Sequence, residues 1–244
     1  MTDANKTLGL IGAAVGILIG GGAVALYQGN AGGGGSKGEM EQTIRAYLLE
    51  HPEVLREASE RLQQKELGKA VSTQRAAFET PFAGAWAGAA DGDVTLVEFF
   101  DYACGYCRKS NADVDRLLRE DPKLKVVWRE WPVLGQDSER AAVASLAAAQ
   151  AGTYRKFFDT LFAAGRPTPD ALARAQQAAG VSADAVAKLQ ASPVVRDELS
   201  KNYQLAQAIG ATGTPTFVVG DEVLQGAVGY EALKEAVEKA RSGA

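Results

Sequence analysis

Short apolar runs predict the strands of this chain. Asp93–Asp101 and Lys123–Trp131 are rich in Val, Leu, Phe and Trp, as expected of strands covered on both faces, and Pro132 stops the second run. Thr216–Gly220 predicts a third strand, and Glu222–Leu224 predicts its short partner in a hairpin.

Helical patterns fill most of the remaining C-terminal part. The stretch from about Ser138 to Ile209 is Ala-rich and helical, and Tyr230–Arg241 closes the chain as a helix. Three predicted helix starts divide the long stretch, each with a capping residue or a proline at the first helical position: Thr168-Pro169-Asp170, Ser182-Ala183-Asp184 and Ser192-Pro193. The order strand, helix, strand, helical block, hairpin, helix predicts an α/β domain over residues 80–244, with a helical insertion at about 138–209.

An amphipathic arm precedes this domain. From Met40 to Leu67 the apolar positions recur at helical spacing, and Pro52, which cannot donate a hydrogen bond and restricts His51, predicts two helices that meet there. The resulting apolar stripe consists of Ile44, Tyr47, Leu48, Val54, Leu55, Ala58 and Leu62. It can be buried on its own domain or against the arms of other chains, and the sequence leaves both open for residues 40–79.

The first residues predict export. Leu8–Tyr27 carries no charge and has about the length that crosses ~30 Å of hydrocarbon. A retained anchor is favoured over a cleaved signal peptide, because the apolar run exceeds the usual ~7–15 residues of a signal-peptide core. The alternative stays open, since Ala23-Val24-Ala25 is an acceptable cleavage site. Residues 1–28 are therefore an anchor or signal segment and residues 29–39 a flexible Gly-rich linker. Either route leads to a compartment where disulfides form.

Composition removes several classes of function. The formal net charge of −4 and the absence of a long basic run argue against nucleic acid as a partner. The only histidine is His51, so a Ser-His-Asp triad or a two-histidine metal site would have to use it.

The two cysteines carry the candidate chemistry. Cys104 and Cys107, separated by Gly105 and Tyr106, follow the first predicted strand and open a helix-like stretch. The positive end of a helix dipole favours a thiolate, so Cys104 is the predicted nucleophile and Cys107 the thiol that resolves the mixed disulfide. Half of a zinc site is the alternative, but zinc would need two further ligands and the chain has no third cysteine.

Two motifs together resemble the DsbA-type thioredoxin superfamily. They are Phe99-Phe100-Asp101-Tyr102-Ala103-Cys104-Gly105-Tyr106-Cys107 and, about a hundred residues later, Gly213-Thr214-Pro215-Thr216-Phe217. The CGYC sequence and the arm segment Tyr47–Val54 are similar to the ScsC-like subgroup, which is associated with copper tolerance. The resemblance extends from roughly Met40 to the C-terminus and implies a thioredoxin-like fold.

The resemblance also implies roles for single residues. Pro215 would follow a cis peptide bond beside the dithiol, with Thr214, Gly105 and Tyr106 contacting the client. Glu98 would be a buried acid that relays protons to Cys107, although strand alternation leaves a solvent-facing Glu98 as an alternative. The two charged residues after the motif, Arg108 and Lys109, are expected to be solvated.

The leading functional hypothesis is a thiol-disulfide oxidoreductase without cofactor or metal. Its expected partners are reduced or misoxidised exported proteins and a membrane redox protein of the DsbD-like or DsbB-like type. Isomerase or reductase action is favoured over oxidase action because of Thr214 and the arm, which predicts a homo-oligomer with a trimer as one candidate. Alternatives from other classes are a Cu(I)-binding copper-tolerance protein that uses the same thiolates and a scaffold with a vestigial dithiol. The expected location is the bacterial envelope, with the catalytic domain in the periplasm, either anchored in the inner membrane or soluble.

Overall fold

The computed structural model describes residues 37–243, which form ten helices and five strands. These residues fall into two compact units that divide between Glu60 and Arg61. The expected segment 1–28 and positions 29–36 of the expected linker 29–39 lie outside the described residues. The linker prediction is wrong for positions 37–39, because the first described helix, α2, begins at Lys37. No helix among residues 37–243 combines the length and the apolar character that a membrane span requires.

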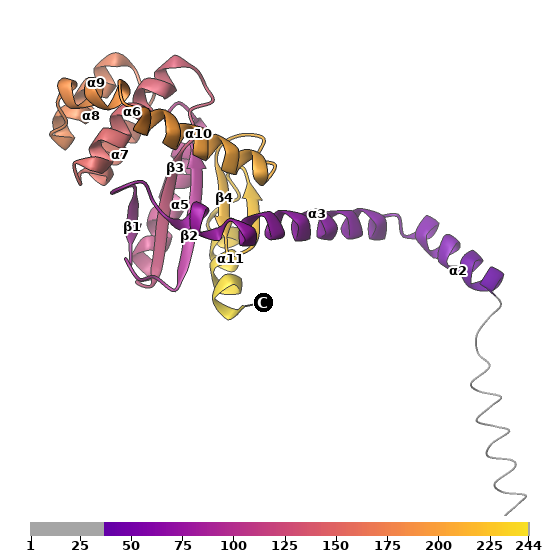
Figure 1. The fold of residues 1–244 in the computed structure, drawn as a ribbon. Helices are drawn as coiled ribbons and strands as arrows, with labels where there is room; N and C mark the ends of the chain where they lie inside the picture. Colours follow the sequence, from indigo (N-terminus) through magenta and orange to yellow (C-terminus); the bar gives the residue numbers. More distant parts are fainter. Residues whose placement is uncertain (1–36, 244) are drawn as a thin grey trace, which may run out of the picture. The chain divides into compact units, whose positions relative to one another are not determined.

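The first unit contains the expected helix break. Helix α2 covers Lys37–Glu50 and α3 covers Glu53–Thr73, so the chain leaves the helical path at His51 and Pro52, as predicted (Figure 1). No residue of α2 is buried, and the stripe residues Ile44 and Leu55 are exposed. Within its own unit the arm therefore leaves part of its apolar stripe exposed.

The second unit is built on one mixed five-stranded sheet with the order β1-β3-β2-β4-β5. Strand β2 lies at its centre, parallel to β3 and antiparallel to β4, and the two outer pairs are antiparallel as well. The strands are β1 Trp86–Gly88, β2 Val94–Phe100, β3 Leu124–Glu130, β4 Thr216–Val219 and β5 Glu222–Gln225. This arrangement confirms the thioredoxin-like α/β fold and each of the four predicted strands.

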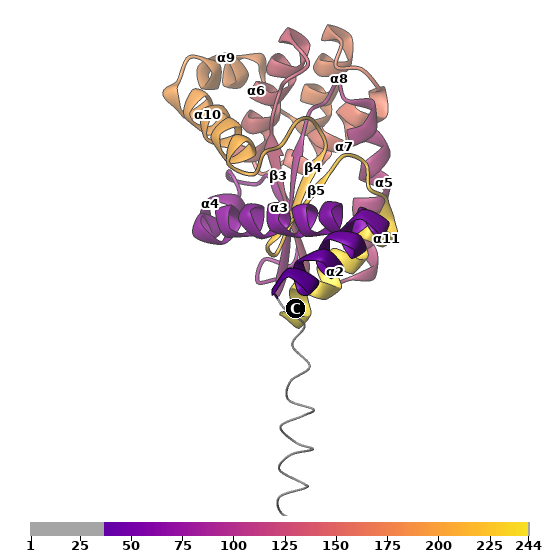
Figure 2. The same cartoon turned by 90° about the vertical axis from the view of Figure 1, so that its right-hand side faces the viewer.

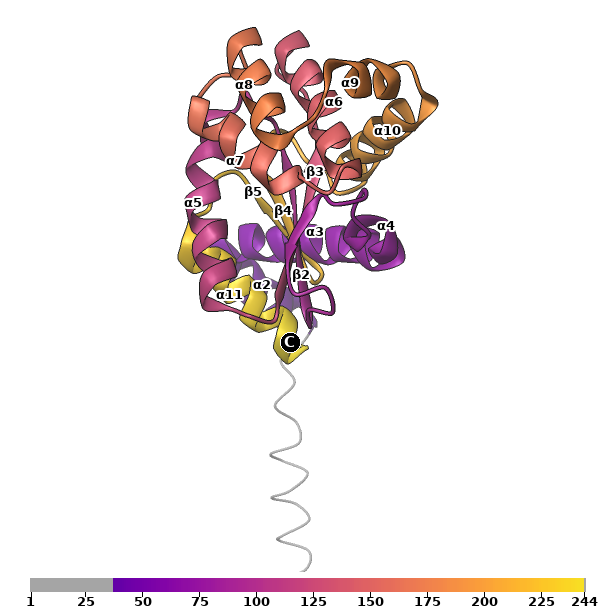
Figure 3. The same cartoon turned by 90° about the vertical axis from the view of Figure 1, so that its left-hand side faces the viewer.

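Helices cover both faces of the sheet (Figures 2 and 3). Helices α5 (Gly105–Glu120) and α11 (Tyr230–Ser242) pack on one face, while α4 (Arg75–Glu79) and α10 (Pro193–Ala208) pack on the other. The inserted helices α6–α9 gather beyond one end of the sheet (Figure 1). They are α6 Gln136–Gln150, α7 Tyr154–Ala164, α8 Pro169–Ala179 and α9 Ala183–Gln190.

Each face of the sheet has its own apolar core. Between the sheet and the insertion, the rings of Phe100, Tyr102 and Phe158 make edge-to-face contacts with centroids 5.0–5.9 Å apart, a geometry that aromatic pairs prefer. On the opposite face, Phe99 contacts Phe78 and Trp131 edge to face. Because both faces are covered, every residue of β2 except the half-buried Thr95 is buried.

A buried arginine joins three segments on the second face. The Arg129 guanidinium, at 0% exposure, donates to Glu198 Oε1 on α10 at 2.9 Å. It also donates to the backbone carbonyls of Ala77, Phe78 and Thr80 at the end of α4. These carbonyls have no helical partner of their own, so Arg129 replaces the missing donors.

The local signals predicted all three helix starts correctly: α8 begins at Pro169, α9 at Ala183 and α10 at Pro193. Thr168 and Ser182 accept hydrogen bonds from Ala171 N and Ala185 N, as capping residues do. Ser192 does not cap α10 with its side chain; its hydroxyl donates instead to Leu189 O in the preceding helix. The short elements β1 and α4 were not predicted.

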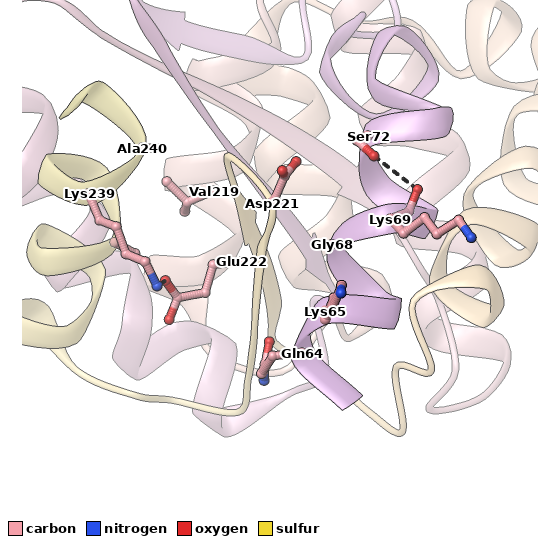
Figure 4. Close-up of a pocket in the computed structure, with 11 residues that line it drawn as sticks. Gln64, Lys65, Gly68, Lys69, Ser72, Val219, Asp221, Glu222, Lys239 and Ala240 are labelled. Atoms are coloured by element: carbon pink, nitrogen blue, oxygen red, sulfur yellow. Dashed lines mark hydrogen bonds and ion pairs between the residues drawn. The ribbon is translucent and has the colours of Figure 1, made fainter. Parts of the chain in front are cut away.

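A groove of about 610 Å³ lies between α3, the β4–β5 turn and α11 (Figure 4). Gly68 permits the close approach of α3 to this turn, because a Cβ there would lie 2.9 Å from Asp221 O. None of the predicted site residues lines this groove.

Candidate active site

The sheet delivers Cys104 to the N-terminus of α5. Strand β2 ends at Phe100, and Cys104 is the N-cap of the helix, with its Sγ accepting from Cys107 N at 3.4 Å. The turn between them is held by Cys104 N, which donates to Asp101 O at 3.0 Å. The strand-to-helix placement of the dithiol is as predicted from the sequence.

This position activates the first thiol. The pKa of Cys104 is lowered to about 5, mainly by hydrogen bonding from the Cys107 side chain. Burial opposes this shift, while hydrogen bonds from the Thr214 side chain and from the N–H groups of Cys107 and Tyr106 add to it. Cys104 is therefore a thiolate at neutral pH, which is the nucleophilic form of cysteine.

The second thiol has the opposite environment. Cys107 is completely buried, and burial raises its pKa far above the ordinary value, with Cys104 and the charge of Glu98 adding to the shift. Both cysteines are free thiols in this structure. One thiol is thus ionised and the other holds its proton, which is the division of roles expected of a nucleophile and a resolving thiol.

Glu98 lies inside the sheet core. Its side chain is fully buried, Oε2 accepts a hydrogen bond from Trp128 Nε1 at 3.0 Å, and Oε1 has no partner among the described residues. Burial raises the pKa of Glu98 to about 8, against the opposing effect of the Trp128 hydrogen bond. The solvent-facing alternative for Glu98 is wrong, because helices cover both faces of β2.

The Thr214–Pro215 segment lies directly against the first thiol. The peptide bond between these residues is cis, as the resemblance implied, and Cys104 Sγ lies 3.2 Å from Thr214 O. Pro215 is buried, and its carbonyl accepts from Gly226 N at 2.8 Å beyond β5. Residues separated by 110 positions in the sequence thus form one site.

The dipeptide between the cysteines faces solvent. Tyr106 is 69% exposed, and a Cβ on Gly105 would meet no atom within 4 Å. Of the two charges that follow, Lys109 is exposed as expected, whereas Arg108 is half-buried, with Nε and Nη2 shielded from solvent and without a partner among residues 37–243. The expectation of a solvated Arg108 is therefore wrong.

Two site residues were not assigned a role from the sequence. Trp128 is the hydrogen-bond donor to Glu98, and only the pairing of β2 with β3 places it opposite that residue. Asp101 follows β2 and accepts four hydrogen bonds with its carboxylate. An acidic residue at the end of an apolar strand was the available signal for Asp101.

The described residues contain no cluster of three or more His, Cys, Asp or Glu side chains arranged to hold a metal ion. The two thiols are the soft ligands that the site offers.

The reactivity of Cys104 is expected to follow its low pKa. Alkylation of the reduced protein by iodoacetamide should rise with pH through about 5 and stay nearly constant from pH 7 to 8, since the thiolate is then fully formed. The rate is measured from pH 4 to 9 by mass spectrometry of the Cys104 peptide, with Cys104→Ser as the control. A midpoint at or above the ordinary thiol value of about 8.5 would contradict the activated thiolate.

Comparison with protein families gives two matches. The profile of the DSBA-like thioredoxin domain matches residues 95–238, more than half of the chain. The profile of the copper resistance protein ScsC N-terminal domain matches residues 37–66, which contain α2 and the first part of α3.

Individual proteins show the same relationship. A thioredoxin-like oxidoreductase from Silicibacter pomeroyi is 39% identical, with a TM-score of 0.66 over 70% of this chain and 99% of that one. Proteus mirabilis ScsC in a transitional conformation is 25% identical, with a TM-score of 0.64 over 88% of this chain and 100% of that one. The Na(+)/H(+) antiporter NhaA 3 of Salinispora tropica is 29% identical over 160 residues, 64% of this chain and 24% of the antiporter. The chain thus spans about a quarter of the length of that relative.

Proposed function

The chain belongs to the DSBA-like thioredoxin family, and we propose that it is a thiol-disulfide oxidoreductase that exchanges disulfides with exported proteins. One observation carries the proposal: Cys104 lies at a helix N-terminus, where its pKa is lowered, and the buried Cys107, whose pKa is raised, lies one turn away. A structural pair of thiols would need no such difference in pKa.

The exchange proceeds in two displacements. The Cys104 thiolate attacks one sulfur of a client disulfide, so a Cys104–client bond forms and the other client sulfur leaves as a thiolate. Cys107 then loses its proton and attacks Cys104, which breaks the mixed disulfide and forms the Cys104–Cys107 disulfide. Two electrons have then moved from the protein to the client. The reverse sequence oxidises a client, and resolution by a client thiol instead of Cys107 isomerises it.

Thr214 supports client binding at this site. Its carbonyl lies 3.2 Å from Cys104 Sγ, and an extended client segment that pairs with this backbone would bring its own sulfur next to Cys104. Gly105 and Tyr106 are exposed beside it and complete the surface that a client meets.

Glu98 is the proposed acceptor of the Cys107 proton. With a pKa of about 8 it holds or releases a proton near neutral pH, and its charge is within electrostatic reach of Cys107. Its Oε1 has no other partner among the described residues, so this atom is free to accept the proton.

Glu98→Gln is expected to slow resolution and not attack. Release of a preformed mixed disulfide should fall by about a hundred-fold, since the amide cannot accept a proton. The wild-type rate should rise between pH 7 and 9 as Glu98 ionises, and this rise should vanish in the variant. Stopped-flow fluorescence of the attack and release steps measures both effects. Glu130→Gln is the matched control, because Glu130 is also buried on the sheet but its carboxyl accepts from Tyr154; an equal effect there would refute a specific role for Glu98.

The direction of exchange follows from the reduction potential. We favour isomerase or reductase action over oxidase action, because Thr214 precedes Pro215 and the arm offers a surface for assembly. Measurement of the Cys104–Cys107 potential against glutathione, with insulin reduction and scrambled ribonuclease as substrates, tests the function and its direction, since a tenfold change in the exchange constant is about 30 mV. A wild-type protein that is inactive on every disulfide would overturn the proposal.

The arm supports a homo-oligomer, with a trimer as one candidate. The stripe residues Ile44, Leu55 and Leu62 are exposed, and α2 buries no residue in the single chain. A continuous apolar stripe on two helices is typical of a surface that packs against its own copies. The clients would then face several dithiols at once.

Ile44→Glu with Leu55→Glu is expected to convert the oligomer to a monomer, because the new charges fall on the packed stripe. Light scattering of residues 37–244 measures the mass of the assembly. Arg56→Glu is the control, because it introduces a glutamate at an exposed polar position, and it should leave the mass unchanged. A monomeric wild type would refute the assembly. Insulin reduction should survive in the monomer, since each site acts alone.

The proposed location is the bacterial envelope, with residues 80–244 in the periplasm and Leu8–Tyr27 as an anchor in the inner membrane. The hydropathy of Leu8–Tyr27 supports this placement. A membrane protein of the DsbD-like or DsbB-like type would then maintain the dithiol or the disulfide. Fractionation of cells, with and without residues 1–28, measures the anchoring; recovery of the full chain in the soluble fraction would contradict it.

Copper binding is a second candidate, favoured by the ScsC N-terminal match at residues 37–66. The two thiolates could hold one Cu(I) ion in a two-coordinate site. Titration of the reduced protein with Cu(I) against a chelator, with Cys104→Ser as control, measures the affinity. Equal affinities of the wild type and the variant would exclude the dithiol as the site.

A further inference from the structure

Asp101 is a buried carboxylate without a cationic partner. It is 1% exposed, and none of the ion pairs among residues 37–243 includes it. Its carboxylate instead accepts four hydrogen bonds from neutral donors. Oδ1 accepts from Ala103 N and Ser138 Oγ, both at 2.7 Å, and Oδ2 accepts from Val133 N and Leu134 N, both at 2.9 Å.

These bonds join segments that are distant in the sequence. Ala103 belongs to the loop that carries Cys104, and the backbone oxygen of Asp101 accepts from Cys104 N. Val133 and Leu134 belong to the loop Pro132–Gly135, which follows β3. One residue therefore fixes both the loop that carries the nucleophile and the loop beside it.

The Pro132–Gly135 loop has few other constraints. It leads into α6, whose N-cap Gly135 has a φ of 107°, a value suited to glycine, and accepts from Glu139 N at 3.1 Å. The side chains of Val133 and Leu134 are 43% and 54% exposed, although both residues are apolar. Burial of a carboxylate costs stability even when it is hydrogen-bonded, and exposed apolar side chains held in a fixed position are typical of a binding surface.

We propose that Asp101 is a positioning residue that holds the Pro132–Gly135 loop beside Cys104, so that Val133 and Leu134 contact apolar side chains next to a cysteine of a protein client. This inference rests on the proposed exchange activity and names the kind of client segment that the site accepts. A small disulfide has no flanking side chains and does not reach the loop.

The isosteric variant Asp101→Asn tests the role of the carboxylate. The amide keeps one acceptor oxygen in place of two, so in either orientation it leaves a backbone donor without a partner: Val133 N and Leu134 N, or Ala103 N. We expect kcat/KM for insulin disulfide reduction to fall by about ten-fold, mainly through a higher KM, and to fall more than kcat/KM for oxidised glutathione, which loses only the contribution of the Ala103–Cys104 loop.

Three further variants make the test specific. Leu134→Ser, at an exposed position, should lower insulin reduction without altering the glutathione reaction. The double variant Asp101→Asn/Leu134→Ser should reduce insulin less than the wild type does, but its loss should not exceed that of the more severe single variant, because both changes act through the same loop. Asp137→Asn is the matched control, because it removes an exposed carboxylate from the same end of α6 and should leave both rates unchanged.

Each result decides between alternatives. Equal losses on insulin and glutathione in Asp101→Asn would place its effect on the dithiol and overturn the inference, as would unchanged insulin kinetics in Leu134→Ser. If Asp101→Asn does not fold, Leu134→Ser and the milder Ser138→Ala, which removes one of the four bonds, decide alone. A wild type that reduces neither disulfide would overturn the proposed function itself, whereas an active wild type with insensitive variants would overturn only the role of Asp101.

Discussion

Cys104→Ser is expected to abolish disulfide exchange while the protein stays folded. A serine hydroxyl remains protonated at neutral pH, so the variant has no nucleophile at the N-terminus of α5. Cys107→Ser should behave differently: Cys104 would still attack, and the mixed disulfide would persist because no second thiol can displace the client. Each variant differs from the wild type by the replacement of one sulfur atom with oxygen, so each serves as a control for the other.

The measurement combines insulin reduction with mass spectrometry of trapped complexes. Cys104→Ser should show neither turnover nor adducts, and Cys107→Ser should show adducts of one client per site. The roles would be reversed if Cys107→Ser lost attack and Cys104→Ser kept it. Such a result would conflict with the complete burial of Cys107 and with the low pKa of Cys104.

Arg129→Met is expected to be the most destabilising single change outside the dithiol. It leaves the Glu198 carboxylate without its cation and three carbonyls at the end of α4 without a donor. Removal of one partner from a buried ion pair costs about 3–5 kcal/mol of unfolding free energy. Urea denaturation followed by tryptophan fluorescence measures the loss.

Two controls separate the possible causes. Arg140→Met breaks an exposed pair with Asp137 and should barely move the midpoint, because such pairs contribute little. Arg129→Met with Glu198→Leu should recover part of the loss, since no buried charge remains unpaired. If Arg129→Met cost as little as Arg140→Met, the proposed role of Arg129 in holding α4 and α10 on the sheet would be wrong.

The proposed assembly surface of the arm and the dithiol lie on different residues. The stripe of Ile44, Leu55 and Leu62 shares no residue with the site around Cys104 and Thr214. Variants of the stripe can therefore change oligomeric state without altering the thiol chemistry, and the expected survival of insulin reduction in a monomer follows from this separation.

The sequence by itself determined the features that depend on neighbours in the chain. Strands β2–β5, the helix break at Pro52 and the caps at Thr168 and Ser182 follow from short apolar runs and single-residue preferences. The same holds for Cys104, because a strand followed at once by a helix places the first cysteine at the helix N-terminus. The cis bond at Pro215 came from the family resemblance and not from any local pattern.

Only the tertiary structure decided the features that depend on distant residues. Alternation along β2 could not show whether the Glu98 side chain is buried. A strand that is covered on both sides carries apolar residues on both faces, so neither face is marked as the solvent side. The three-residue β1 and the five-residue α4 are too short to show a hydrophobic period. Strand β1 is held by its pairing with β3, and α4 is held by hydrogen bonds from the Arg129 guanidinium. Asp101 has its partners at Val133, Leu134 and Ser138, more than thirty positions away, and a buried carboxylate finds such donors only when the folded chain brings them together.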